Sequence, residues 1–177
     1  DRMGTLVGDL LELARASDTV NPASTDLAAL TEAVLDKARA LGDRQWTLDE
    51  AAQVTCCLDP TRITQAWLQL AQNAVQYSAD GTLIAIGSGT DLQWARLWVR
   101  DRGIGIAPDD IKCVRQRFVR GTAGTESVAG SGLGLNIVES IARAHGGHLD
   151  IESTPGVGST FTLVIPQRPC GASGETS

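Results

Sequence analysis

Two glycine clusters about thirty residues apart constrain this chain more than any other feature. The first, residues 101–105 (DRGIG), follows a strand-like stretch, and the second, residues 130–135 (GSGLGL), opens a stretch with helical periodicity. A glycine-rich loop that opens a helix presents free N–H groups and the positive end of the helix dipole to phosphates. The second cluster has neither the preceding strand of a Rossmann motif nor the Gly-Lys-Ser/Thr of a P-loop, which disfavours both common nucleotide folds.

The first cluster contains a carboxylate that can recognise a base. Asp101 ends an alternating strand and can accept a hydrogen bond from an exocyclic amine such as that of adenine. Gly103 and Gly105 let the backbone approach a ligand with no Cβ in the way. The alternative is a strand that simply ends in an Asx turn. The irregular segment between the two clusters has the length typical of a functional lid.

Upstream lies a polar helix face that can hold a metal. Gln69, Asn73 and Gln76 are spaced i, i+4 and i+7, so they share one face of a predicted helix. The oxygen of an Asn side chain suits Mg²⁺, which takes its other ligands from water and substrate phosphates. The alternative is that these amides only solvate the helix. In order along the chain, the three features favour one site for a purine nucleotide.

The hydrophobic periodicity predicts an α+β protein, a two-layer α/β sandwich of helices and mostly antiparallel strands. Ser24 or Thr25 can cap the second helix, and Pro60 suits the first turn of the third. The predicted helices cover residues 1–16, 26–41, 59–77 and 133–144, with a short one near 109–117. The predicted strands cover residues 45–48, 53–58, 82–88, 93–100, 148–153 and 159–165.

The pattern divides the chain into three parts. Residues 1–20 form an amphipathic helix that begins in mid-pattern, so we expect a fragment of a longer protein. This helix either packs on its own domain or is the remnant of a helical-hairpin dimerisation element. Residues 21–166 form the main domain, and residues 167–177 are a small, polar tail that we expect to be disordered.

The composition indicates which partners the chain is unsuited to bind and which cellular compartment to expect. The net charge of −6 leaves no basic surface for nucleic acid or anionic membrane. No apolar run approaches the length of a transmembrane span. The four cysteines form no CxxC pair, which makes zinc improbable and a reduced cytosolic chain the default. His145 and His148 flank Gly146-Gly147, where we expect a helix C-terminus with a left-handed glycine cap and His145 favourable to the dipole.

Five segments together resemble the catalytic, ATP-binding domain of sensor histidine kinases, within the superfamily that includes gyrase-type and Hsp90-type ATPases. Residues 69–78 resemble the N box, 101–106 the first glycine box and 117–121 the phenylalanine box. Residues 130–135 resemble the second glycine box and 156–161 the last one. The resemblance covers roughly residues 26–166, which is most of the chain, and implies a left-handed-crossover (Bergerat-type) sandwich with a mobile ATP lid.

The resemblance also implies cofactors, partners and roles. ATP and Mg²⁺ are the implied cofactors, with Asn73 on Mg²⁺, Asp101 on adenine and the Ser159 hydroxyl supporting Asp101. The implied partners are a histidine-bearing dimerisation and phosphotransfer domain, in cis or in trans, and a response regulator. The implied location is the cytoplasm, free or as part of a membrane-bound sensor, with no membrane contact in this segment. The implied site comprises Asn73, Tyr77, Asp101, Gly103, Gly105, Ile106, Arg120, Gly130, Ser131, Gly132, Leu133, Gly134 and Ser159.

Three positions depart from the family pattern. Gln69 replaces the usual Asn, Gln76 replaces a Lys or Arg near the phosphates, and Arg115 replaces an aromatic residue. Loss of that cation should weaken ATP binding by about 1–3 kcal/mol. Gln69 also stands where gyrase-type ATPases have a glutamate base, which favours phosphoryl transfer over hydrolysis. A degenerate module acting in protein interaction and a gyrase- or Hsp90-like ATPase remain the alternatives.

Overall fold

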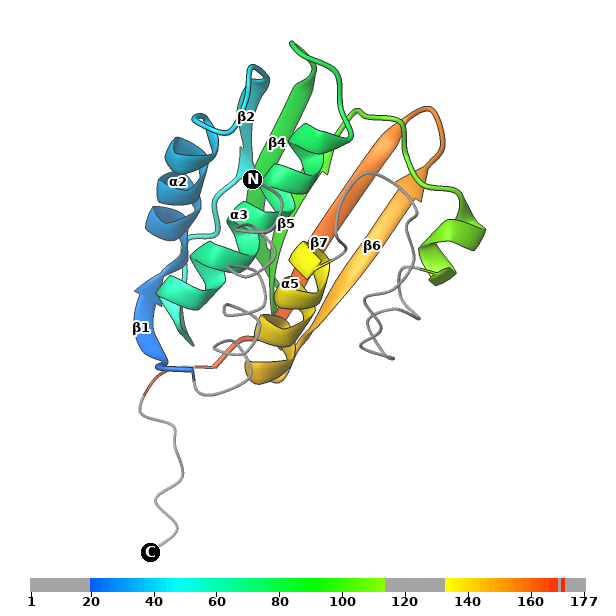
Figure 1. The fold of residues 1–177 in the computed structure, drawn as a ribbon. Helices are drawn as coiled ribbons and strands as arrows, with labels where there is room; N and C mark the ends of the chain where they lie inside the picture. The colour runs from blue at the N-terminus through cyan, green and yellow to red at the C-terminus, as the bar shows by residue number, and fades with distance from the viewer. Residues whose placement is uncertain (1–19, 114–132, 169, 171–177) are drawn as a thin grey trace, which may run out of the picture.

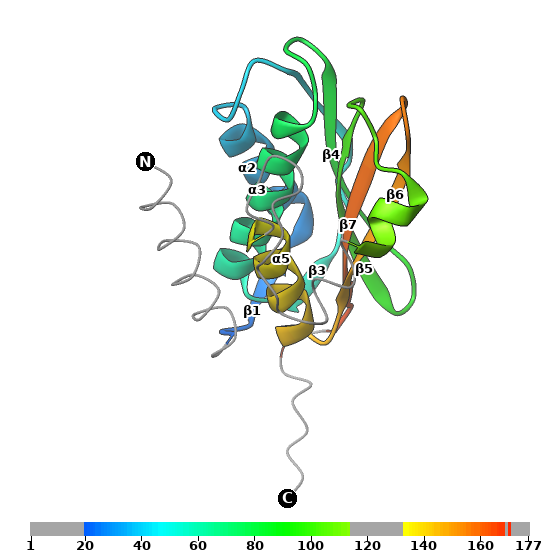
Figure 2. The same ribbon diagram turned by 45° about the vertical axis from the view of Figure 1, so that its right-hand side comes forward.

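The computed structural model describes residues 20–113, 133–168 and 170, and these residues form two layers. Three helices lie on one face of a five-stranded sheet, and the turned view separates the two layers clearly (Figures 1 and 2). The helices are α2 (Leu27–Ala38), α3 (Pro60–Gln76) and α5 (Leu133–Ala144). Helices α3 and α5 run antiparallel and side by side, so the end of α3 and the start of α5 lie toward the same side of the molecule (Figure 1).

The sheet is mixed and its strand order differs from the chain order. The order is β2-β4-β5-β7-β6, in which β2 and β4 are parallel and the other neighbours antiparallel. Strands β1 and β3 form a separate antiparallel pair. The strands are β1 (Ala23–Asp26), β2 (Gln45–Glu50), β3 (Thr55–Leu58), β4 (Leu83–Thr90), β5 (Trp94–Asp101), β6 (His148–Thr154) and β7 (Gly158–Pro166).

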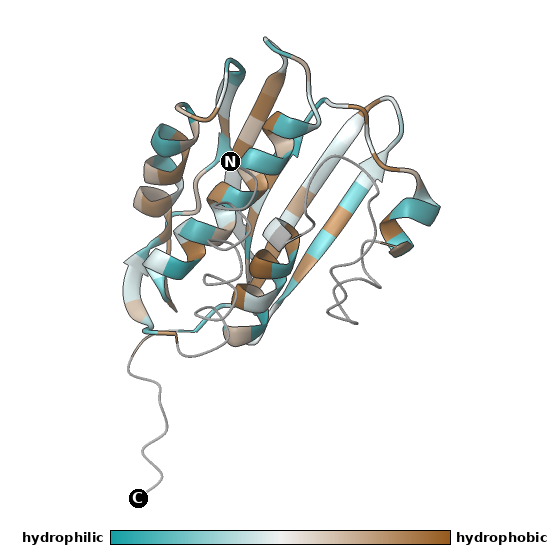
Figure 3. Ribbon diagram, viewed as in Figure 1, coloured by the Kyte–Doolittle hydropathy of each residue, from teal (hydrophilic) through white to brown (hydrophobic). Residues whose placement is uncertain are grey.

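The core lies between the sheet and the helices, as the periodicity predicts. In β5, Ala95, Leu97 and Val99 are buried and alternate with outward-facing residues. Strand β6 shows the same alternation as brown and teal bands in Figure 3. Burying one large apolar side chain contributes about 1.5–3 kcal/mol, so the packed stripe of α3 holds the helix firmly on the sheet. That stripe comprises Ile63, Ala66, Trp67, Leu70, Ala71 and Ala74.

The starts of the two first helices are fixed by aspartates. Asp59 caps α3 by accepting from the N–H groups of Thr61 and Arg62, with Pro60 in the first turn as predicted. The predicted cap of α2 at Ser24 or Thr25 is wrong, because α2 begins at Leu27 and the residue directly before it is Asp26. The cap is Asp26, whose carboxylate accepts from Ala29 N–H.

Two expectations about the cysteines and the C-terminal segment are wrong. The cysteines are not all reduced, and the segment after Pro166 is not free along its whole length. Cys57 and Cys170 form a disulfide, while Cys56 is buried and free. Cys57 N–H also donates to the carbonyl of Arg168. Successive residues of a strand point to opposite faces, so Cys56 enters the core and Cys57 faces away from it. The chain is therefore attached to the fold as far as Cys170.

Some predictions lie outside the described residues. These are the helix over residues 1–16, most of the segment between the two glycine clusters, and Arg115, Arg120, Gly130, Ser131 and Gly132. Within that segment, residues 108–113 are helical, where a short helix was predicted. Among the residues that the model describes, no helix is long and apolar enough to cross a membrane.

Candidate nucleotide site

Asp101 is the last residue of β5 and one of few buried carboxylates in the described chain. Asp101 is only 5% exposed, and its Oδ1 accepts a hydrogen bond from Gly103 N–H at 2.8 Å. The backbone N–H of Ser159, its register partner on β7, also donates to the carboxylate. Burial raises the pKa of Asp101 above its ordinary value, and the two hydrogen bonds act in the opposite direction. The result is a desolvated acceptor with lone pairs left for a ligand.

Ser159 supports Asp101 through its backbone N–H, whereas the resemblance implied a contact from its hydroxyl. Its hydroxyl lies 2.7 Å from the hydroxyl of Ser153, whose own proton goes to the carbonyl of Gly158 at 3.0 Å. Ser153 Oγ also accepts from Ile106 N–H at 2.7 Å. The Ser159 hydroxyl therefore donates to Ser153, and the contact of Ser159 with Asp101 comes from its backbone N–H.

The loop after Asp101 is braced on both sides by backbone contacts. Ile104 N–H donates to the carbonyl of Tyr77, and the carbonyl of Ile104 accepts from Gly156 N–H at 2.8 Å. A Cβ on Gly103 would lie 2.1 Å from the Tyr77 carbonyl oxygen. A Cβ on Gly105, whose φ is +72°, would lie 2.1 Å from the carbonyl oxygen of Thr154. The glycines are thus required by the protein's own backbone, a reason that the sequence did not indicate.

The polar face of α3 meets the start of α5. Gln69 and Asn73 are half-buried, whereas Gln76 is exposed. A Cβ on Gly134 would lie 2.9 Å from Oε1 of Gln69, so the side chain of Gln69 faces the first turn of α5. Asn73 lies one turn further along the same helix, and its carbonyl accepts from Tyr77 N–H. The structure thereby joins the Asn73 helix to the loop that carries Gly103 and Gly105.

Most of the predicted site is therefore one connected region. Backbone contacts unite the residues at the end of α3, the loop after β5 and the start of β7, and Gly134 adjoins them through Gln69. The connected residues are Asn73, Tyr77, Asp101, Gly103, Gly105, Ile106 and Ser159. Leu133 is the first residue of α5.

Two contributors were missed by the sequence analysis. Ser153 reaches the site because β6 and β7 pair it with Ser159. Arg44 reaches the end of α3 from the loop before β2. Neither carries a spacing signal, since strand pairing and the path of a loop bring them there.

Comparison with known proteins places the chain in a family. Residues 58–169 match the family described as "Histidine kinase-, DNA gyrase B-, and HSP90-like ATPase", and the chain belongs to this family. The sensor-like histidine kinase SenX3 of Mycobacterium tuberculosis (strain ATCC 25618 / H37Rv) is 35% identical over 176 residues, covering 94% of this chain and 42% of SenX3. The phosphate regulon sensor protein PhoR of Pseudomonas aeruginosa is 35% identical over 168 residues, covering 91% of this chain and 38% of PhoR.

A solved structure agrees with the fold and with the family. The mycobacterial sensor histidine kinase MprB superposes with a TM-score of 0.69 at 26% identity, covering 84% of this chain and 99% of that one. The predicted two-layer fold and the resemblance to sensor histidine kinases are confirmed. The chain is a catalytic, ATP-binding domain of this kind. It spans less than half the length of SenX3 and PhoR.

Proposed function

We propose that this chain binds Mg-ATP and transfers the γ-phosphoryl group to a histidine on another segment or another chain. From that histidine the group would pass to an aspartate of a response regulator. The observation that carries the proposal is the buried Asp101 carboxylate, held by two backbone N–H groups beside a glycine loop that the fold braces. A desolvated acceptor fixed in this way suits recognition of the amine of adenine.

The remaining roles follow from the residues around Asp101. Asn73 offers a half-buried neutral oxygen that fits Mg²⁺, an ion that keeps several waters and takes substrate phosphates as ligands. When bound, the ion neutralises charge on the phosphates. The start of α5 with Gly134, preceded by Gly130, Ser131, Gly132 and Leu133, would hold the phosphates on N–H groups and the helix dipole. Tyr77 would lie beside the nucleotide, and the resemblance adds Arg120 to the residues that would bind it.

Gln69 supports transfer over hydrolysis. Its amide cannot take a proton from water at neutral pH, and it packs against α5 as a neutral side chain. In phosphoryl transfer the protein mainly positions phosphate and metal, which needs no such base. A gyrase- or Hsp90-like ATPase would instead release phosphate steadily without any partner.

The proposed partners are those of the wider assembly. A histidine-bearing dimerisation and phosphotransfer domain would supply the acceptor, in cis or in trans, and a response regulator would receive the phosphoryl group. We place this reaction in the cytoplasm, in a free protein or in the cytoplasmic part of a membrane-bound sensor. Nucleic acid plays no part in it.

Calorimetry with ADP and with a non-hydrolysable ATP analogue, each with Mg²⁺, tests the proposal. We expect binding by the wild-type chain, loss of binding in Asn73→Ala, and unchanged binding in the control Gln72→Ala, which alters an exposed neighbour on α3. No binding near millimolar nucleotide would favour the degenerate module instead. With labelled ATP, we expect label on an added histidine-bearing hairpin and none on this chain alone. Stable self-phosphorylation of the isolated chain contradicts that last expectation.

A further inference from the structure

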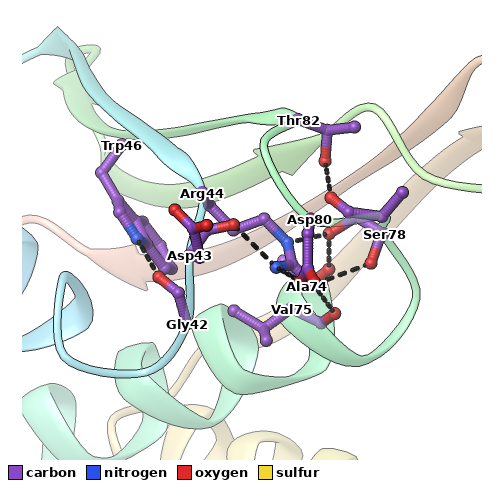
Figure 4. A network of polar contacts seen from close by, with 10 residues as sticks. Gly42, Asp43, Arg44, Trp46, Ala74, Val75, Ser78, Asp80 and Thr82 are labelled. Atoms are coloured by element: carbon purple, nitrogen blue, oxygen red, sulfur yellow. Dashed lines mark hydrogen bonds and ion pairs between the residues drawn. The ribbon is translucent and has the colours of Figure 1, made fainter.

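The side chain of Arg44 is almost fully buried and uses every N–H that it has. Arg44 lies in the loop between α2 and β2, and its side chain is 5% exposed. Figure 4 shows the guanidinium between the end of α3 and the turn that follows it. Nε donates to Ser78 Oγ at 3.0 Å. The Nη1 group donates to the carbonyl of Asp43 and to the carboxylate of Asp80, and Nη2 to the carbonyls of Val75 and Ser78.

These bonds supply what α3 lacks at its own end. The last turn of α3 contains no basic residue, although helix C-termini have unpaired carbonyls and a partial negative charge. From another part of the chain, Arg44 donates to the carbonyl of Val75 in this last turn and to the carbonyl of Ser78 just beyond the helix, at 2.8 Å each. Ser78 Oγ, which accepts from Arg44, donates in turn to the carbonyl of Ala74 at 2.6 Å. Arg44 therefore fixes the helix end as a rigid unit.

The loop that follows Asp101 packs against this end of α3 and is hydrogen-bonded to it. Tyr77 lies between Val75 and Ser78, whose carbonyls Arg44 binds, and its own carbonyl accepts from Ile104 N–H at 3.2 Å. The same oxygen leaves no space for a Cβ on Gly103. Gly103 N–H in turn donates to Asp101. A shift of the Tyr77 carbonyl would therefore move the N–H group that aims the Asp101 carboxylate.

Arg44 does not replace the missing cation at position 76. A phosphate-binding arginine needs free N–H groups facing solvent, whereas all five of Arg44 are engaged within the protein. Its connection to the nucleotide runs through the backbone of α3 toward the base end of the site. Any effect of Arg44 on binding should thus concern recognition of the base more than the phosphates.

We propose that Arg44 is a positioning residue for recognition of the purine base, acting through the Tyr77 carbonyl and the loop of Gly103 and Ile104. The inference rests on the proposed function, because it takes Asp101 as the acceptor for the exocyclic amine. The planar five-donor fork is essential to this role. A lysine at position 44 keeps the charge but has only three donors on a flexible stem, so it cannot hold the same acceptors together.

The test compares ADP with IDP, which lacks the exocyclic amine, by calorimetry with Mg²⁺ on the full chain. We expect Arg44→Lys to lower the ratio of the IDP to the ADP dissociation constant by about fivefold or more, the size of one good hydrogen bond. The matched control is Arg96→Lys, because Arg96 is half-exposed and pairs only weakly with Asp91 at 3.5 Å. This control should keep the wild-type ratio.

Ser78→Ala keeps the test decisive if Arg44→Lys fails to fold. It removes the acceptor of Nε and leaves Arg44 in place, so the ratio should fall in the same direction by a smaller factor. Thermal melts establish that each variant is folded. A wild-type ratio in folded variants that merely melt earlier would show that Arg44 only stabilises the chain, which overturns the inference. Failure of the wild-type chain to bind ADP overturns the proposed function, and the inference with it.

Discussion

Two aspartates are buried in the part of the chain that the structure describes, and their hydrogen bonds show that they have different roles. Asp59 is 6% exposed, and its carboxylate accepts from the backbone N–H groups of Asn21, Thr61 and Arg62. The bonds from Thr61 and Arg62 cap α3, and the bond from Asn21 holds the chain before β1 against this cap. These structural bonds account for the burial of Asp59. Asp101 accepts two bonds, from Gly103 and Ser159, at the edge of a tightly braced loop. Of the two, Asp101 leaves more of its acceptor capacity unused while it is equally buried, which is what a ligand requires.

The raised pKa of Asp101 predicts a pH dependence of base recognition. Because burial raises this pKa above 3.8, the carboxyl takes up its proton at a higher pH than an exposed aspartate would. Protonation removes the charge that strengthens the bond from an amine. We therefore expect the ratio of the IDP to the ADP dissociation constant to fall toward one as the pH falls, with a midpoint above 3.8. The ratio cancels titration of the phosphates, which both nucleotides share.

A comparison with Asp101→Asn, whose side chain cannot titrate, isolates this effect. The ratio measured with this variant should be low, and its remaining pH dependence is that of the nucleotide bases alone, which is subtracted from the wild-type curve. If the ratio of the wild-type chain stays constant across the range in which the chain is folded, Asp101 is not the acceptor for the base.

Among the elements, α3 and α5 are tied together at the end remote from the candidate site. The ring of His145, just after α5, lies with Nδ1 2.7 Å from the carbonyl of Ile141 and Nε2 3.1 Å from the N–H of Asp59. A carbonyl needs a donor and an N–H needs an acceptor, so the ring is neutral with its proton on Nδ1. Gly146, with φ +82°, ends α5 as predicted. The expected favourable cation at the dipole is replaced by a neutral bridge between two helices.

The bridge predicts that stability declines on mild acidification. Burial lowers the pKa of His145 below 6.5, with the hydrogen bond to Ile141 and the charge of Asp59 acting in the opposite direction. As the pH falls below 6.5 the unfolded chain takes up a proton first, so stability drops until the lower folded pKa is reached. The slope is at most about 1.4 kcal/mol per pH unit for one group. Urea denaturation at several pH values measures it.

The second histidine is the natural control for this effect. His148 is exposed, so His148→Ala should keep the pH dependence of the urea midpoint, whereas His145→Ala should flatten it and lower stability throughout. Equal slopes in the two variants would show that other groups cause the decline.

At the scale of the whole molecule, the segment after β7 links the main sheet to the separate β1–β3 pair. Gln167 N–H donates to the carbonyl of Gln93 beyond the sheet, and Cys170 is bonded to Cys57 on β3. This link joins residues 113 positions apart. It attaches the small β1–β3 pair, which is otherwise separate from the main sheet, to the strand that ends in Pro166.

Removal of this link should lower the free energy of unfolding. Chain-entropy arguments for a loop of this length give at most about 4–5 kcal/mol. We expect Cys170→Ser, and the wild-type chain with reductant, to melt at a lower temperature than the oxidised wild-type chain. The control Cys113→Ser alters an exposed free cysteine and should change nothing. Alkylation of the denatured, unreduced chain should label Cys56 and Cys113 only; labelling of all four cysteines would contradict the pairing.

Local periodicity and capping chemistry made much of the fold predictable. The extent of α3, its buried stripe, the alternation of β5 and the hairpin of β6 and β7 all follow from patterns within a few residues of each other. The carboxylate and the glycines of the candidate site were also visible, because their order along the chain is itself the signal. The cap of α2 was less predictable, because Ser24, Thr25 and Asp26 are all good caps and their type alone does not fix the residue at which the helix begins.

The sequence by itself determined the family and most of the described helices and strands, though not β1, and it predicts Asn73 and Asp101 as the centre of the candidate site. Only the tertiary structure decided which distant side chains meet. Arg44 at the end of α3 and Ser153 beside Ser159 meet at the candidate site, whereas His145 on Asp59 and Cys57 with Cys170 meet away from it. The physical reason is the sequence separation over which each interaction acts. Periodicity and capping act within one or two turns, whereas these contacts form only after the sheet order and the antiparallel packing of α3 and α5 bring remote segments together.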